Sequence, residues 1–402
     1  MLEKFLKIKW YYIVAFLFAS LSNVYLTTIT SYSPAYVGIF LAIISFLFFI
    51  DKNEKIKSSA RTTELVLFIF FLLAFLILDC LVTNNNNQVS YYINYWFFNQ
   101  FLFVLGVYYF QRCNIKQIIR IVKGLFVISA LVFLIDFAYR MSNSISQYSG
   151  LLAFYNFKFN DLMFQDSNWP GFMSMLLFSF LVYFKDNKYL KSKIIIIITF
   201  LLVVQSLSRA AIACCIFVLF FSKFLKLKKT TRYYIITLGL PIIIGSIIFI
   251  LTNLKDGSYL TKLTLLQGML YYITHFDLNT LLWGNYPDAC HDNLIFMHVW
   301  LGGHLYMTRY IDFGFITGIF EFILFFVICK YTHYKALYIL LPFFMAGMSF
   351  APWHLPYMYV LLSLVYVLEN KLYKLNTTDY CIKFDLKKSL AIVFKYSKGK
   401  KI

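Results

Sequence analysis

Twelve apolar runs follow one another along the chain, with few residues between most of them. A helix needs about 20 residues to cross a bilayer, and most of the runs are close to that length. Because 61% of the residues are hydrophobic and only 14% are charged, a water-soluble core of this size could not enclose the apolar surface. We therefore expect an all-α integral membrane protein with about 12 transmembrane helices, in which residues 1–402 form a single polytopic membrane domain. The runs lie at residues 10–30, 34–50, 64–83, 91–110, 121–139, 169–184, 194–207, 210–222, 233–251, 313–329, 336–351 and 355–368.

The basic residues are distributed unevenly between the connections. If the N-terminus is cytoplasmic and the sides alternate, the cytoplasmic segments hold 31 of the 37 Lys and Arg residues. This bias predicts that both termini are cytoplasmic, with 369–402 as a basic cytoplasmic tail. The first run has no small-residue cleavage site after it, so we expect a membrane helix there rather than a cleaved signal. The net charge of +19 then reflects anchoring to anionic lipid and does not indicate nucleic-acid binding. The outer side keeps Arg140, Lys158, Arg209, Lys255, Lys262 and Arg309.

The basic tail leaves two interpretations open. Leu386, Leu390, Val393 and Phe394 have helical spacing between lysines, which suits a helix lying on the membrane surface. A solvated, disordered tail fits the same residues. The seven cysteines lie mostly in or beside apolar runs and form no CxxC pair, so we expect neither a disulfide framework nor a metal site.

Two of the expected outer connections are long, at about 140–168 and 252–312. Loops carry function more often than the elements they connect, and a large structured loop on one face of a membrane bundle needs a reason. We therefore look for the functional site on the outer face, and first in the second loop. It contains four of the six histidines, His275, His291, His298 and His304.

The end of the second loop combines a histidine with charged residues. His304 and Asp312 are eight residues apart, so they share one helix face, and Arg309 can pair with Asp312. Lys262 lies near the start of an earlier helical pattern in the same loop. A histidine beside Arg and Asp at the mouth of a span can serve as an acid or base. The alternative is a histidine that only caps a helix or lies in the membrane interface.

Arg209 lies between two unusually short runs. Each run of about 14 residues reaches about 21 Å, less than the roughly 30 Å of the hydrocarbon core. The Ser208-Arg209 hairpin tip should therefore lie below the outer surface. An Arg at that depth is costly, and its guanidinium suits phosphate oxygens. The alternative is an Arg that reaches up to the lipid headgroups.

A third feature opens the sixth run at Asp166-Ser167-Asn168, just before a proline. Asn or Asp ahead of Pro is good helix-capping chemistry, which alone explains these residues. A role in the outer site is the alternative.

Taken in order, three motifs resemble the O-antigen polymerase and O-antigen ligase superfamily. That superfamily has an Asp-x-Asn motif opening a span, a Ser-Arg-Gly/Ala hairpin between two short spans, and a large periplasmic loop ending in a His motif with two glycines. The resemblance covers roughly residues 155–330. Leu305 stands where Asn commonly follows the His, Asp312 replaces a usual Glu, and Pro is absent after Asp166; these departures weaken the ligase alternative more than membership. The matching residues are Asp166 and Asn168, Ser208 to Ala211, and His304 with Asp312, Gly314 and Gly318.

The resemblance implies a fold similar to type C glycosyltransferases and an enzyme at the periplasmic face of the bacterial inner membrane. Its substrate would be an undecaprenyl-diphosphate-linked oligosaccharide, with no metal, cofactor or nucleotide sugar. We favour an O-antigen polymerase, a membrane glycosyltransferase of lipopolysaccharide O-antigen biosynthesis, with membrane lipid and a chain-length regulator protein as partners. The alternatives are an O-antigen ligase that transfers glycan to lipid A core, and a non-enzymatic flippase for lipid-linked glycans. A flippase is disfavoured because the chain shows no two-fold repeat.

The implied chemistry assigns roles to the candidate residues. An acceptor hydroxyl attacks the anomeric carbon, and the lipid diphosphate leaves with growing negative charge. His304 is expected as the catalytic base or as the residue that orients the acceptor, while Arg209 and Arg309 would bind the diphosphate. The remaining candidates for substrate binding are Lys262, Asp166, Asn168 and Asp312.

Overall fold

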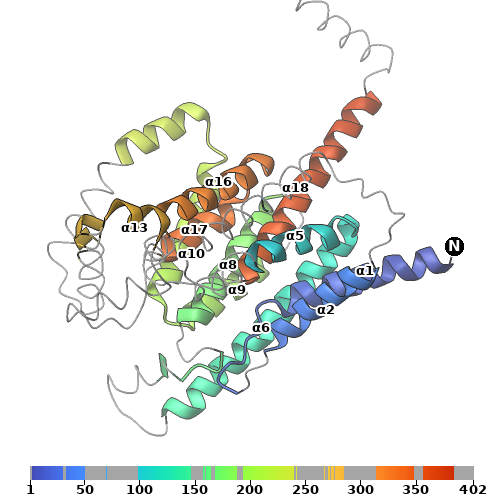
Figure 1. Ribbon diagram of the computed structural model, residues 1–402, viewed down its shortest axis with the longest axis horizontal. Helices are drawn as coiled ribbons and strands as arrows, with labels where there is room; N and C mark the ends of the chain where they lie inside the picture. The colour runs from blue at the N-terminus through green and yellow to red at the C-terminus, as the bar shows by residue number, and fades with distance from the viewer. Residues whose placement is uncertain are drawn as a thin grey trace, which may run out of the picture.

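The computed structural model contains only α-helices as regular elements in the part of the chain that it describes (Figure 1). This confirms the all-α prediction. By length and composition, one described helix, Ile115–Asn143, could cross a membrane, and five further apolar helices are shorter. The expected number of twelve spans therefore stays a prediction. The described residues are 2–29, 33–49, 69, 98–145, 157–158, 160–163, 168–187, 193–239, 241, 267, 270–271, 273–275, 277–284, 314–347 and 356–383.

Most described helices coincide with predicted apolar runs, but two extend well beyond them. α6 runs from Ile115 to Ile145, so a helix continues past the expected start of the outer connection at about residue 140. α18 runs from Pro356 to Lys383, so the first part of the predicted tail continues the last helix. The remaining helices are α1 (Leu2–Leu21), α2 (Pro34–Phe49), α5 (Phe98–Phe110), α8 (Asn168–Asp186), α9 (Ile194–Val204), α10 (Arg209–Phe224), α13 (Leu278–Trp283), α16 (Phe315–Tyr331) and α17 (Leu337–Gly347).

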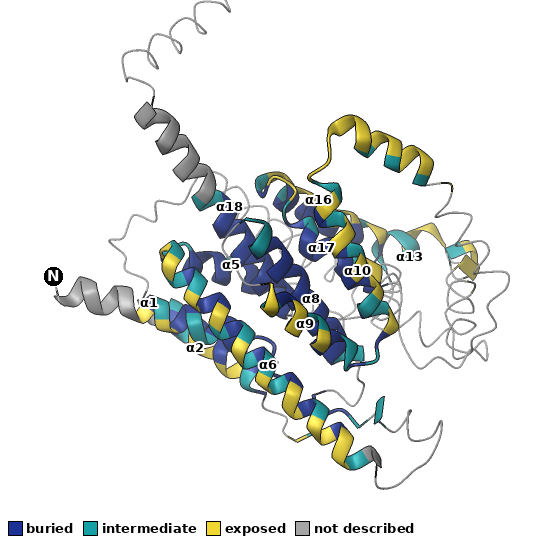
Figure 2. Cartoon of the chain, turned by 180° about the vertical axis from the view of Figure 1, so that it is seen from behind, coloured by how far each residue is buried: buried dark blue, intermediate teal, exposed yellow. Residues whose placement is uncertain are grey.

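α8 is the central helix of the bundle. Every residue from Pro170 to Phe184 is buried, so this helix has no face toward the surroundings. A helix that is apolar and buried all round must be enclosed by others. Its neighbours include α6, α9, α10, α17 and α18, and Figure 2 shows it as a dark core behind lighter outer helices. Residues placed at either end of α8 are therefore held by several elements at once.

The outer helices expose apolar side chains. On α9, Ile196, Leu202 and Val203 are buried, yet the opposite face carries only further aliphatic side chains. A surface of this kind needs an apolar covering rather than water. Exposed large apolar side chains also lie on α6, α10 and α16, whose exposed residues are yellow in Figure 2. The exposed apolar side chains of α9 and α16 include Ile194, Ile197, Ile198, Leu201, Ile319, Phe322, Ile323 and Phe326.

Candidate functional site

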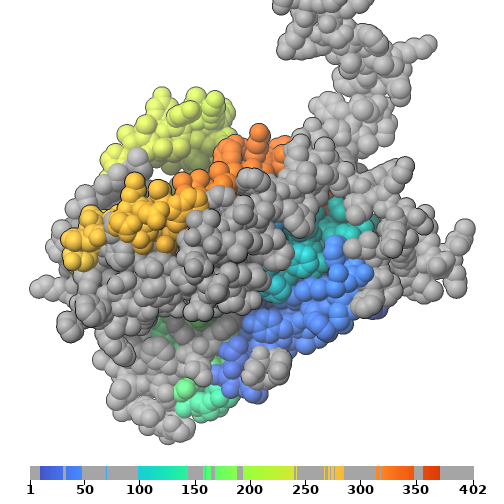
Figure 3. Space-filling view, in the orientation of Figure 1, coloured from blue at the N-terminus to red at the C-terminus, as the bar shows by residue number. Residues whose placement is uncertain are grey.

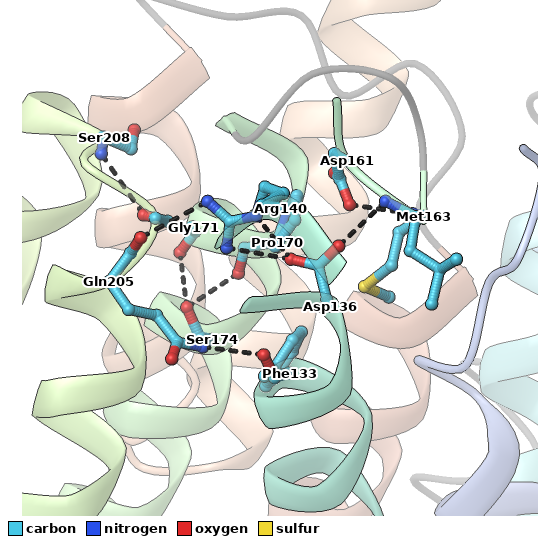
Figure 4. Close-up of polar contacts among 12 residues, drawn as sticks. Phe133, Asp136, Arg140, Asp161, Met163, Pro170, Gly171, Ser174, Gln205 and Ser208 are labelled. Atoms are coloured by element: carbon cyan, nitrogen blue, oxygen red, sulfur yellow. Dashed lines mark hydrogen bonds and ion pairs between the residues drawn. The ribbon is translucent and has the colours of Figure 1, made fainter. Parts of the chain in front are cut away.

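A buried polar cluster lies where the last turns of α6 meet the start of α8 and the turn between α9 and α10 (Figure 4). We call it the α6-end cluster and define it as Asp136, Arg140, Asp161 and Gln205. The side chains of Asp136 and Arg140 are both 0% exposed. Charged side chains that are completely buried have to be paired. Their partners therefore show which parts of the chain the cluster connects.

Arg140 connects α6 to the α9–α10 turn. Its Nε and Nη2 contact Asp136 Oδ2 at 2.9 Å and 2.8 Å, one helical turn away. Its Nη1 donates to the Gln205 backbone carbonyl at 3.3 Å, and its Cζ lies 4.8 Å from the Phe157 ring centre. In the other direction, Gln205 Nε2 donates to the Phe133 carbonyl at 3.0 Å. α6 therefore holds this turn at two points.

Asp136 connects α6 to the segment 160–163. Its Oδ1 accepts a hydrogen bond from the Leu162 backbone at 2.9 Å. The Met163 carbonyl in turn accepts from the Thr27 backbone at 3.1 Å, in the connection between α1 and α2. One carboxylate of α6 is thus joined, through a single short segment, to the connection between α1 and α2.

Asp161 adds a second acid to the same buried space. Burial and, after it, the neighbouring Asp136 together raise the pKa of Asp161 to about 9, although the Met163 N–H and Arg140 oppose the shift. The raised pKa means that Asp161 holds its proton to higher pH than an exposed carboxyl does. Its Oδ2 is buried and makes no hydrogen bond within the described structure.

The start of α8 lies directly against the α9–α10 turn. Asn168 begins the helix and is half-buried. One turn later, Gly171 faces Ser206 and Ser208 so closely that a Cβ added to it would lie 2.8 Å from the Ser208 Cβ. Two of the three sequence motifs, about 40 residues apart, are therefore side by side.

The predicted hairpin is present, and its tip is tightly formed. α9 ends at Val204 and α10 begins at Arg209, with Leu207 at φ 56°, in the left-handed region. At 1.5 Å per residue α9 is roughly 16 Å long, even shorter than predicted. Arg209 is exposed, whereas Ser208 before it is buried. The guanidinium of Arg140 is therefore buried in the cluster, whereas Arg209, at the end of the adjoining turn, is exposed.

Five of the predicted site residues cannot be compared with this geometry. Asp166, Lys262, His304, Arg309 and Asp312 lie outside the described residues. Their predicted roles remain predictions.

The structure describes the end of the His304 motif at Gly314. It precedes α16 with φ 82° and ψ 153°, a conformation that favours glycine. A Cβ on Gly314 would lie 2.6 Å from the backbone of Trp283 and of Gly284. This contact joins α13 to α16, and their atoms abut on the surface in Figure 3. The structure therefore explains one motif glycine by packing, and leaves His304 unplaced.

Most of the α6-end cluster is not predicted from the sequence. There, Arg140 is only one of the outer basic residues, and Asp136, Asp161 and Gln205 have no predicted role. One signal was available, because Asp136 and Arg140 are four residues apart at the end of an apolar run. Ionisable residues inside such a run are expensive unless they pair.

A second polar cluster lies at the other end of α8, around Asp186. Its carboxylate accepts from Ser222 Oγ at 2.5 Å, Lys226 Nζ at 2.6 Å and Tyr338 OH at 2.7 Å. These donors come from α10, the turn after it, and α17. We call these four residues the Asp186 cluster; it ties the three helices together at this end.

Comparison with known proteins adds no relative. No family model matches the chain, and neither a curated protein nor a solved structure is significantly similar to it. Among the described residues there is no group of three or more His, Cys, Asp or Glu that could hold a metal ion. The family resemblance thus still rests on the motifs alone.

Proposed function

We propose that the chain is an integral membrane protein of the bacterial inner membrane, with about twelve spans and cytoplasmic termini. The exposed aliphatic faces of α9 and α16 support this, since lipid chains would cover them. The bias of Lys and Arg toward one set of connections gives the orientation. Reporter fusions test it directly. Fusions at 155 and 285 should be periplasmic and fusions at 188 and 227 cytoplasmic; a cytoplasmic result at 285 would contradict the orientation.

Within that membrane, we propose an O-antigen polymerase that joins undecaprenyl-diphosphate-linked oligosaccharide units. The observation that carries the proposal is the meeting of two motifs, the start of α8 at Asn168 and the turn that presents Arg209. Arg209 is exposed at the start of α10, where the Ser208 cap makes no side-chain hydrogen bond to the helix. A guanidinium at a helix N-terminus is a suitable place for phosphate oxygens. The depth expected for this turn corresponds to the diphosphate of a lipid-linked substrate.

The proposed reaction is one glycosyl transfer. A hydroxyl of the acceptor unit forms a bond to the anomeric carbon of the donor, while the bond from that carbon to the diphosphate oxygen breaks. The hydroxyl proton passes to His304, and the electron pair leaves with undecaprenyl diphosphate. Arg209 and Arg309 would stabilise the charge that builds on this leaving group. Asn168 and Asp166 would hold the entrance of α8 or contact sugar.

Deleting the gene and examining the lipopolysaccharide on a gel tests the proposal. A polymerase deletion should leave lipid A core carrying a single repeat unit. Core alone, with lipid-linked chains accumulating outside, would indicate the ligase alternative, and core alone with lipid-linked units trapped inside would indicate a flippase. Restoring the wild-type gene should restore the full ladder, whereas Arg209→Lys at equal protein level should not.

A further inference from the structure

We propose that Asp136 and Arg140 are positioning residues, whose buried pair fixes the α9–α10 turn and thereby the place of Arg209. This inference rests on the proposed function, because it concerns the residue assigned to the diphosphate. Neither residue belongs to the three motifs. Both are too deeply buried to touch a substrate themselves.

The pair is bound on both sides. Asp136 Oδ2 accepts a hydrogen bond from Arg140 Nε and lies 2.8 Å from Nη2, so the guanidinium is oriented by an ion pair with its own helix. The remaining direction of the fork, Nη1, points to the Gln205 carbonyl, as Figure 4 shows. A guanidinium held in this way fixes the height of the turn above α6, which a single lysine ammonium could not do.

Gln205, which Arg140 contacts, lies only four residues before Arg209 along the chain. Gln205 caps α9, and Ser206 Oγ accepts from the Ser208 backbone at 3.2 Å. Ser208 then precedes the first residue of α10 and is 5% exposed against α8. No flexible stretch separates the point that Arg140 holds from the guanidinium that faces outward. A shift at Gln205 should therefore move Arg209.

The first half of α6 is held against α1 by contacts that do not involve the α6-end cluster. Asn23 Nδ2 of the α1 end donates to Ser129 Oγ at 2.5 Å. α6 also packs closely on α1, where Gly124 faces the Phe16 ring. A variant that loosens only the Arg140 end should still insert and keep its helices, so the proposal can be tested in a folded protein.

The first readout does not depend on activity. Ser208→Cys places a thiol at the buried end of the turn, and its labelling by a small maleimide in membranes reports on the turn. We expect slow labelling in Ser208→Cys alone and labelling at least about ten-fold faster when Arg140→Lys is added, since about 1.4 kcal/mol of local loosening gives a factor of ten. Lys226→Ala, at the opposite end of α8, is the matched control and should leave the rate unchanged. Each variant is compared with the same chain lacking Ser208→Cys.

The second readout is elongation of purified lipid-linked repeat units. Arg140→Lys should lower kcat about ten-fold or more with KM for the donor changed much less, because Arg209 acts on charge that develops in the transition state. If Arg140 acts through Arg209, the double variant Arg140→Lys/Arg209→Lys should be no slower than Arg209→Lys alone.

Two results would overturn the inference: labelling at Ser208→Cys that Arg140→Lys does not change, or losses that multiply in the double variant. If the wild-type protein fails to elongate the units, the proposed polymerase activity is wrong. The labelling comparison still decides whether Arg140 fixes the turn.

Discussion

A polar cluster with an Asp–base ion pair lies at each end of α8, and the two pairs differ in their exposure to solvent. In the α6-end cluster, Asp136 and Arg140 are both 0% exposed. In the Asp186 cluster, Lys226 is 62% exposed and Asp186 10%. The first holds a turn and a loop segment against α6, whereas the second joins α10, the turn after it and α17 to the end of α8.

The two ion pairs differ in what their loss would do to the fold, because one is buried and the other is exposed. An ion pair in contact with water contributes little, because solvent already satisfies both charges. A buried pair gains little overall either, but losing one partner leaves an unpaired charge in an apolar place. Burial therefore makes the α6-end cluster intolerant of change without making it the main source of stability. Such intolerance suits a region whose geometry has to be fixed.

The largest contrast is expected between the two basic residues. Arg140→Ala leaves Asp136 buried without its guanidinium and should lower the free energy of unfolding by about 3–5 kcal/mol. Lys226→Ala should lower it by about 1 kcal/mol or less. Thermal unfolding of both purified variants in detergent checks this, and equal shifts would remove the distinction between the two ends.

The pH dependence of stability sharpens the comparison further. Because the pKa of Asp161 is raised to about 9 in the fold, the stability it contributes is full below about pH 4 and is lost as pH rises toward 9. Asp136, Arg140 and the Met163 N–H are the groups that face it. The slope should approach about 1.4 kcal/mol per pH unit between these limits. Asp161→Asn is neutral at every pH and should abolish this slope; an unchanged slope would show that Asp161 does not hold the proton.

A glycine substitution tests the close approach of α8 to the turn. Gly171→Ala places a Cβ 2.8 Å from the Ser208 Cβ, so helix and turn must separate, at a cost of about 1–3 kcal/mol. Gly239→Ala is the control, because a Cβ there meets nothing within 4 Å. Thermal unfolding and maleimide labelling at Ser208→Cys should both respond to the first substitution and not to the second. Identical behaviour of the two variants would contradict the packing.

The smallest effect is expected from a hydroxyl in the Asp186 cluster. Tyr338→Phe removes one of three donors to Asp186 and keeps the ring, so it should cost about 1 kcal/mol. Elongation of lipid-linked units should be unchanged, because this end of α8 lies away from Arg209. A variant with normal stability and lost elongation would place a functional site at the wrong end of the helix.

The sequence predicted the helices better than it predicted the buried cluster. An apolar run predicts a helix because its own side chains determine whether it is buried. The two short runs on either side of Arg209 correctly predicted a hairpin. The end of α6 was missed because Arg140 was taken to mark the outer surface, whereas it turns inward to Asp136 and the helix continues. The other partners of the pair, the Leu162 N–H and the Gln205 carbonyl, are backbone groups without a sequence signature. Only the tertiary structure could bring them together.

The most direct test of the proposed site is elongation of purified undecaprenyl-diphosphate-linked repeat units by matched amounts of protein. We expect a ladder of chains from the wild type, and loss of most activity in Arg209→Lys because a lysine lacks the guanidinium fork. His304→Ala should bind the lipid-linked donor yet form no long chains, while His291→Ala and His298→Ala should be milder. Full-length chains from both Arg209→Lys and His304→Ala at wild-type rates would contradict an active site built on these residues.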